Sequence, residues 1–86
     1  MWGVNDQPRG WKLEVGRAVY TRDYQKLGSI ADLSRHAFRV KAGGWSRDYW
    51  LSRGTIRSIA SDGAVMLLID KSQLGQNKLK TGIVVD

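Results

Sequence analysis

Apolar and polar residues alternate over residues 26–42, and a period of two is typical of a half-buried β-strand. The alternation predicts one strand at Lys26–Leu33 and a second at residues 37–42, joined by a polar turn at residues 34–36. It breaks near residues 28–30, where a glycine and an out-of-phase isoleucine predict a β-bulge. We expect the rest of the fold to be built around this stretch.

The second of these strands has the clearest two-faced pattern. Phe38, Val40 and Ala42 share one parity, so we expect them to face the core. Arg39 and Lys41 share the other parity and would face solvent. The pattern therefore predicts a sheet with one packed face and one basic face.

Strand-forming residues also lie on either side of this stretch. Residues 13–21 predict a first strand, and residues 22–25 predict the turn that follows it. Tyr24 is a poor residue for that turn, because a bulky side chain disfavours positive φ. A glycine-containing loop at residues 43–47 leads to a fourth strand at residues 48–52.

The remaining elements are short. Two isoleucines three positions apart within residues 53–59 predict a single helical turn that leads into a short strand. Asp62 and Gly63 predict a hairpin turn, because both residue types tolerate positive φ. Residues 64–70 follow as an apolar strand, and residues 71–75 as a short helical turn closed by glycine.

The strand at residues 64–70 is apolar on both faces, unlike a strand with one solvated side. Its odd-numbered residues would line the core. Met66 and Leu68 face the other way and form a candidate apolar interface. We expect this face to be covered by residues 83–85, by a partner protein, or by a second copy in a homodimer.

About six short strands with turn signals between them predict an all-β fold, a small antiparallel β-barrel with a short C-terminal helical turn. The 86 residues suffice for one such domain. We assign the domain to residues 13–75, an irregular N-terminal arm to residues 1–12, and a tail to residues 76–86. Residues 83–85 are apolar and could add an edge strand.

Positive charge gathers in the middle of the chain. The net charge is +6, and residues 34–57 hold six basic residues against a single acidic one, Asp48. Such a surface suits RNA, single-stranded DNA, anionic lipid or an acidic protein, although it could also be only a solvated face. The candidate partner or nucleic-acid surface comprises Arg35, Arg39, Lys41, Arg47, Trp50, Arg53 and Arg57.

The composition argues against several classes of function. There is no cysteine, so disulfides and cysteine-based metal sites are excluded, which fits a cytoplasmic protein. His36 is the only histidine, and no nucleophile, base and oxyanion donors can be assembled with it. The longest apolar run, residues 64–69, is far shorter than the ~20 residues of a membrane-spanning helix. We expect no transmembrane segment, secretion signal, catalysis, metal or cofactor.

Several short motifs follow one another along residues 14–75. They are Val19 with Tyr20, the Lys-Leu-Gly-x-Ile motif at residues 26–30, Tyr49 with Trp50, Ile56 with Ile59, Asp62 with Gly63, and Asp70-Lys71 before Leu74. Their order and spacing resemble the PRC-barrel superfamily, small β-barrels found in the H subunit of photosynthetic reaction centres, in a ribosome-maturation factor, and alone in bacteria and archaea. The resemblance implies a docking or adaptor module with no shared catalytic residues.

The chain departs from that family pattern at two corners. Tyr24 stands where the family usually has glycine, and Ser52 where it often has proline. These departures concern the geometry of the first turn and the rigidity of a corner.

We therefore predict a non-catalytic protein-interaction or assembly adaptor without a small-molecule substrate. The alternative is a small barrel that binds nucleic acid through the basic and aromatic residues between Arg39 and Arg57, with bases stacking on Trp50 if it faces outward. We favour the other placement, in which Trp45 and Trp50 pack over a barrel end or under the N-terminal arm.

Overall fold

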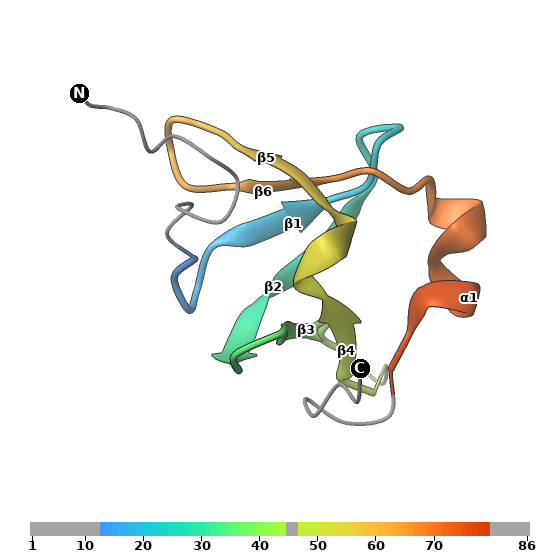
Figure 1. Cartoon of the computed structure of the whole chain (residues 1–86), viewed down its shortest axis with the longest axis horizontal. Helices are drawn as coiled ribbons and strands as arrows, with labels where there is room; N and C mark the ends of the chain where they lie inside the picture. The colour runs from blue at the N-terminus through green and yellow to red at the C-terminus, as the bar shows by residue number, and fades with distance from the viewer. Residues whose placement is uncertain (1–12, 45–46, 80–86) are drawn as a thin grey trace.

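The computed structural model describes residues 13–44 and 47–79, which form a six-stranded sheet with short helical segments (Figure 1). The predicted arm at residues 1–12 and the predicted edge strand at residues 83–85 lie outside the described residues. The strands are β1 (Ala18–Tyr20), β2 (Lys26–Leu33), β3 (Ala37–Lys41), β4 (Tyr49–Ser52), β5 (Ile56–Ile59) and β6 (Val65–Leu67). The helical segments are η3 (Arg53–Thr55), η4 (Lys71–Gln73) and α1 (Leu74–Asn77).

The sheet is mixed and open, with the strand order β4-β3-β2-β1-β6-β5. The β-rich character expected from the sequence is confirmed, but the prediction of a closed, antiparallel barrel was wrong. β1 runs antiparallel to β2 but parallel to β6, with Val19 opposite Val65 and Tyr20 opposite Met66. The two edge strands, β4 and β5, are not paired with each other in this strand order.

The 3-10 turn η3 forms the corner between the two edge strands β4 and β5. It separates the two edge strands along the chain and offers its backbone groups to other segments. The Arg53 N–H donates to the His36 carbonyl oxygen at 2.9 Å, and the Thr55 carbonyl accepts from the Leu68 N–H at 2.7 Å. The corner is thereby attached to the β2–β3 turn on one side and to the end of β6 on the other.

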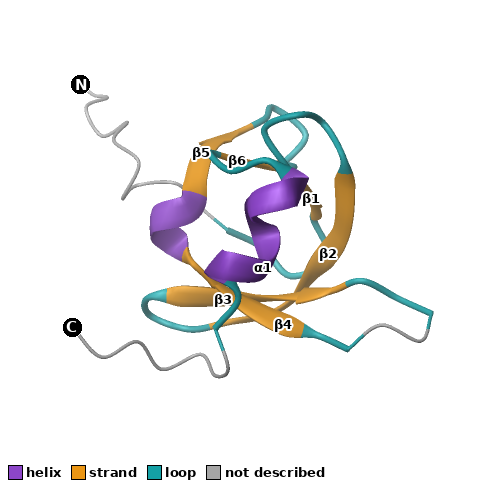
Figure 2. Ribbon diagram, turned by 90° about the vertical axis from the view of Figure 1, so that its right-hand side faces the viewer, coloured by secondary structure: helices purple, strands orange, loops and turns teal. Residues whose placement is uncertain are grey.

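The core lies inside the curved sheet, and α1 lies across one end of it (Figure 2). Phe38, Val40, Val65 and Leu67 are fully buried, as the alternating pattern predicts. Ala42 was expected to face inward but is exposed, because β3 ends at Lys41.

β2 is irregular on both sides of the predicted bulge. Its pairing with β1 skips Leu27, and its pairing with β3 skips Ala31. Between them Gly28 has φ +151, and a Cβ there would lie 2.1 Å from the Lys41 carbonyl oxygen. A glycine is required at this position because the backbone of β3 passes too close for any side chain.

The turn between β1 and β2 is organised around a buried threonine. Tyr24 adopts φ 63, the left-handed conformation that favours glycine. Thr21 is fully buried, its hydroxyl donates to Asp23 Oδ1, and it accepts the Gln25 N–H at 3.0 Å. These hydrogen bonds hold the turn in shape without a glycine.

The C-terminal elements are close to those expected. The apolar strand is shorter than predicted, because β6 covers only Val65–Leu67. The expected helical turn is present as η4 followed by α1, but Gly75 does not close it, because α1 continues to Asn77. In residues 13–44 and 47–79, we find no helix with the length and apolar character needed to cross a membrane.

A cationic pocket between the sheet and the C-terminal helical segment

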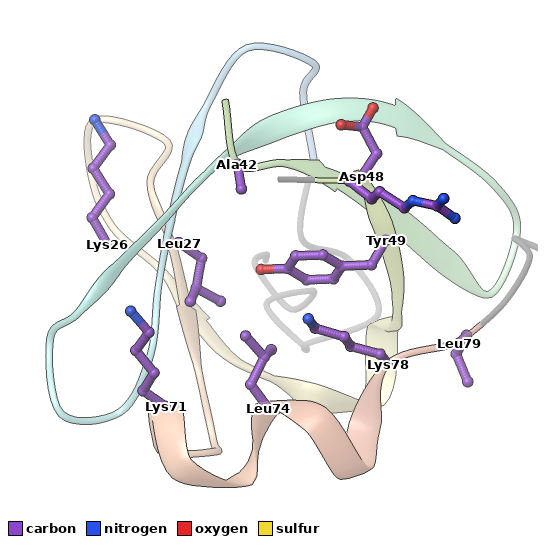
Figure 3. A pocket seen from close by; sticks show the side chains of 10 residues that line it. Lys26, Leu27, Ala42, Asp48, Tyr49, Lys71, Leu74, Lys78 and Leu79 are labelled. Atoms are coloured by element: carbon purple, nitrogen blue, oxygen red, sulfur yellow. The ribbon is translucent and has the colours of Figure 1, made fainter. Parts of the chain in front are cut away.

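A pocket of about 550 Å³ opens between the sheet and the segment formed by η4 and α1 (Figure 3). We call it the cationic pocket. It is lined by Lys26, Leu27, Ala42, Arg47, Asp48, Tyr49, Lys71, Leu74, Lys78 and Leu79. Its volume is within the range of known ligand sites.

Local structure explains which side chains reach the pocket. At the start of β2, Lys26 is exposed while the following Leu27 is buried, since neighbours on a strand face opposite ways. Leu74, at the start of α1, is buried against the core and fixes the helical segment in place. Lys71 and Lys78 flank this anchor along the chain, so both reach the pocket.

Tyr49 is the central side chain of the pocket. It projects from β4 and is half-buried, and its hydroxyl points towards Leu27 in Figure 3. Burial raises the pKa of the Tyr49 phenol above its ordinary value, which already keeps the hydroxyl protonated at neutral pH, so the group can donate a hydrogen bond there. The ammonium nitrogen of Lys78 lies 4.5 Å from the centre of the Tyr49 ring, a cation–π contact.

Positive charge exceeds negative charge in the pocket lining. The lining contains four cationic residues and one acidic residue, Asp48. Asp48 Oδ2 lies 3.8 Å from Arg39 Nε on the neighbouring strand, and its carboxylate points away from the Tyr49 ring in Figure 3. Within residues 13–44 and 47–79, Lys26, Arg47 and Lys71 form no ion pair. The pocket therefore presents a positive potential to an incoming ligand.

Two residues of the surface predicted from the sequence meet across β3 and β4. Arg39 and Trp50 are opposite one another in the strand pairing, and the guanidinium carbon lies 5.8 Å from the centre of the indole ring. Arg39 Nε itself is buried without a hydrogen bond. The pair forms a cation–π platform, with Trp50 partly exposed.

Arg53 has a structural role. Its Nε and Nη2 atoms donate to the Ser34 carbonyl oxygen at 3.0 and 2.6 Å, which fixes the β2–β3 turn. Arg35 is exposed in that turn, next to the equally exposed His36.

The other predicted residues are dispersed. Arg47 lines the cationic pocket, and Lys41 lines an adjoining hollow that shares Lys26 with it. Arg57 is exposed on β5, the edge strand at the other end of the strand order. The structure therefore divides the predicted basic surface among several places.

No sequence pattern predicted that Lys26, Tyr49, Lys71 and Lys78 would share one site. They lie on separate elements, and only the docking of α1 on the sheet brings them together. The sequence does place basic residues next to leucines. This pattern is common on the surfaces of soluble proteins, so it does not identify a site.

The candidate apolar interface is partly exposed. Leu68 is 50% exposed and Met66 is half-buried. Its role in self-association stays a prediction.

Comparisons of the chain with protein-family models, with curated proteins and with solved structures found no match. Over the described part of the chain, no group of three His, Asp or Glu side chains is placed to hold a metal ion.

Proposed function

We propose that the protein is a non-catalytic interaction module of the PRC-barrel type that binds an acidic segment of a partner protein in the cationic pocket. The observation that supports this most is the set of cations around the pocket, of which Lys26, Arg47 and Lys71 form no ion pair within residues 13–44 and 47–79. Unpaired cations around a concave site attract anionic ligands and orient them.

The arrangement of the cations favours a compact acidic segment over a nucleic-acid backbone. Lys26, Lys71 and Lys78 surround a small apolar centre, whereas single-strand-binding surfaces track a backbone with basic residues and offer open aromatic faces. The Tyr49 ring is half-buried and already contacted by Lys78. The absence of cysteine fits a cytoplasmic site of action.

Fluorescence anisotropy with a labelled peptide rich in Asp and Glu tests this proposal. The double variant Lys26→Gln/Lys71→Gln should weaken binding by about tenfold or more, because it removes two pocket cations. The matched control Arg35→Gln/Arg57→Gln removes the same charge from exposed positions outside the pocket and should change affinity much less. Equal weakening by both variants would show that net charge, rather than the pocket, attracts the peptide.

A second candidate function is nucleic-acid binding, which the Arg39–Trp50 contact favours. An indole ring with a guanidinium over it can stack on a base while the cation meets a phosphate. A labelled single-stranded oligonucleotide should then bind with steep salt dependence, and Trp50→Ala should weaken it. No binding at low ionic strength would eliminate this candidate.

A further inference from the structure

The cationic pocket has an apolar floor as well as a charged rim. Leu27 and Leu74 approach the Tyr49 ring across the pocket in Figure 3, and Ala42 adds an exposed methyl group. A site for a bare polyanion would gain nothing from such a floor, since apolar surface attracts only apolar groups.

The charges are arranged around that floor on two sides. Figure 3 shows Lys26 and Lys71 beyond Leu27, and Lys78 against the Tyr49 ring, on the opposite side of Leu74 from Lys71. A ligand that contacts the floor therefore has cations on both sides of the contact.

We propose that the pocket selects acidic protein segments that carry one apolar anchor residue with carboxylates on both sides of it. This proposal rests on the proposed function and specifies its ligand. The anchor side chain enters between Leu27, Tyr49 and Leu74, and the flanking carboxylates meet Lys26 and Lys71 on one side and Lys78 on the other. The Tyr49 hydroxyl donates a hydrogen bond to a carbonyl or carboxylate oxygen of the segment.

Physical chemistry assigns different roles to the two parts of the ligand. Ion pairs with solvated lysines are weak singly and are screened by salt, so carboxylates mainly set specificity and the association rate. Burial of the anchor depends little on salt and slows dissociation. Discrimination by the anchor should therefore persist at ionic strengths that weaken purely acidic ligands.

Two labelled nonapeptides with identical carboxylates, one with a central Phe and one with a central Gly, test the proposal. The Phe peptide should bind at least about tenfold tighter, and this ratio should be kept between low and physiological salt. Equal affinities would overturn the apolar-anchor proposal and leave the proposed function standing, whereas no binding of either peptide would overturn both. Oligothymidylate provides a further test. If it displaces the Phe peptide and binds the protein more tightly than the Phe peptide does, the proposal would be overturned in favour of a nucleic-acid ligand.

Pocket variants locate the anchor. Tyr49→Phe keeps the ring and should retain the ratio between the two peptides, whereas Tyr49→Ala should reduce it towards one. Val15→Ser, which removes an exposed apolar side chain outside the pocket lining and outside the candidate apolar interface, is the matched control and should leave the ratio unchanged.

Amide chemical shifts of the wild-type protein give a second readout that needs no variant. Adding the Phe peptide should shift amides at Leu27, Tyr49 and Leu74. Shifts confined to the region of Arg39 and Trp50 would contradict the proposed site.

Discussion

Arg22 and Asp70 join the β1–β2 turn to the start of η4 through two hydrogen bonds. Arg22 Nε donates to Asp70 Oδ1 at 2.9 Å, and Nη2 donates to Oδ2 at 2.8 Å. Next to this ion pair, the Lys71 N–H donates to Asp23 Oδ1 at 3.3 Å. These contacts hold the helical segment that forms one wall of the cationic pocket, so they connect the first turn of the fold to its candidate site.

The Arg22–Asp70 ion pair predicts loss of stability in acid. The hydrogen bond from Arg22 lowers the pKa of Asp70, and the hydrogen bond from Thr21 lowers the pKa of Asp23. A carboxyl group whose folded-state pKa is depressed contributes stability above its unfolded value, about 3.9, and loses it as the pH falls through the folded value. The thermal unfolding midpoint should therefore decrease once the pH falls below about 4. In Asp70→Asn, the midpoint should depend less on pH in this acidic range.

Two further variants complete this test. Arg22→Ala should lower the thermal midpoint at neutral pH, because it removes both hydrogen bonds to Asp70. Asp32→Asn, which also removes one carboxylate, serves as the control. An acid profile of Asp70→Asn identical to that of the wild type would refute the assignment.

Gly28→Ala should be among the most damaging single substitutions in the described chain. The added methyl group would meet the Lys41 carbonyl oxygen at 2.1 Å, and the φ of +151 is strained for alanine. Overpacking and backbone strain together should cost about 3 kcal/mol or more in the free energy of unfolding, measured by urea titration. Gly75→Ala in α1 serves as the control, because an added Cβ there would have no atom within 4 Å. This substitution should leave the free energy of unfolding unchanged or raise it. Similar midpoints for the two variants would contradict this account of β2.

Tyr24→Gly should leave the protein as stable or raise the free energy of unfolding by up to about 1 kcal/mol. The left-handed conformation costs a residue with a Cβ roughly 1–2 kcal/mol, and the flexibility of glycine in the unfolded chain offsets part of the gain. The side chain is 71% exposed, so few contacts are lost. Tyr24→Ala keeps the Cβ and should show no gain. A larger loss with glycine than with alanine would indicate that backbone strain at this turn is unimportant.

Self-association through the candidate apolar interface can be tested by size-exclusion chromatography with light scattering. If Met66 and Leu68 mediate a homodimer, Leu68→Glu should yield a monomer, because it places a charge in the apolar contact. Val15→Glu alters another exposed apolar residue, 60% exposed, and should leave the dimer intact. A wild-type protein that is monomeric at all concentrations would rule the homodimer out.

Local sequence signals account for much of this fold. The limits of β2 follow from alternation and turn residues, which act within a few positions of each other. The helical turn before a short strand is confirmed as η3 and β5, but the isoleucine spacing was the wrong reason for it, because Ile56 and Ile59 both lie in β5, where the pairing with β6 is irregular. The conformation of Tyr24 could not be predicted from such local preferences. Its turn is held by hydrogen bonds of the buried Thr21 rather than by a residue suited to positive φ.

Features that depend on distant segments were not predictable in the same way. The parallel pairing of Val19 with Val65 has no marker in either strand, and it makes the sheet mixed. The cationic pocket likewise requires the docking of Leu74 on the core, which no spacing rule reveals.

The pairing of β1 with β6 also has a consequence for how the chain acquires its structure. The other strand pairs join neighbours in sequence, whereas this one must bring together the beginning and the end of the described chain. Closing so long a loop is entropically costly, so we expect it to be a late and slow event. During synthesis on the ribosome, the β1 edge stays bare until Val65 has emerged, and in that interval the nascent chain is most exposed to aggregation and to chaperones.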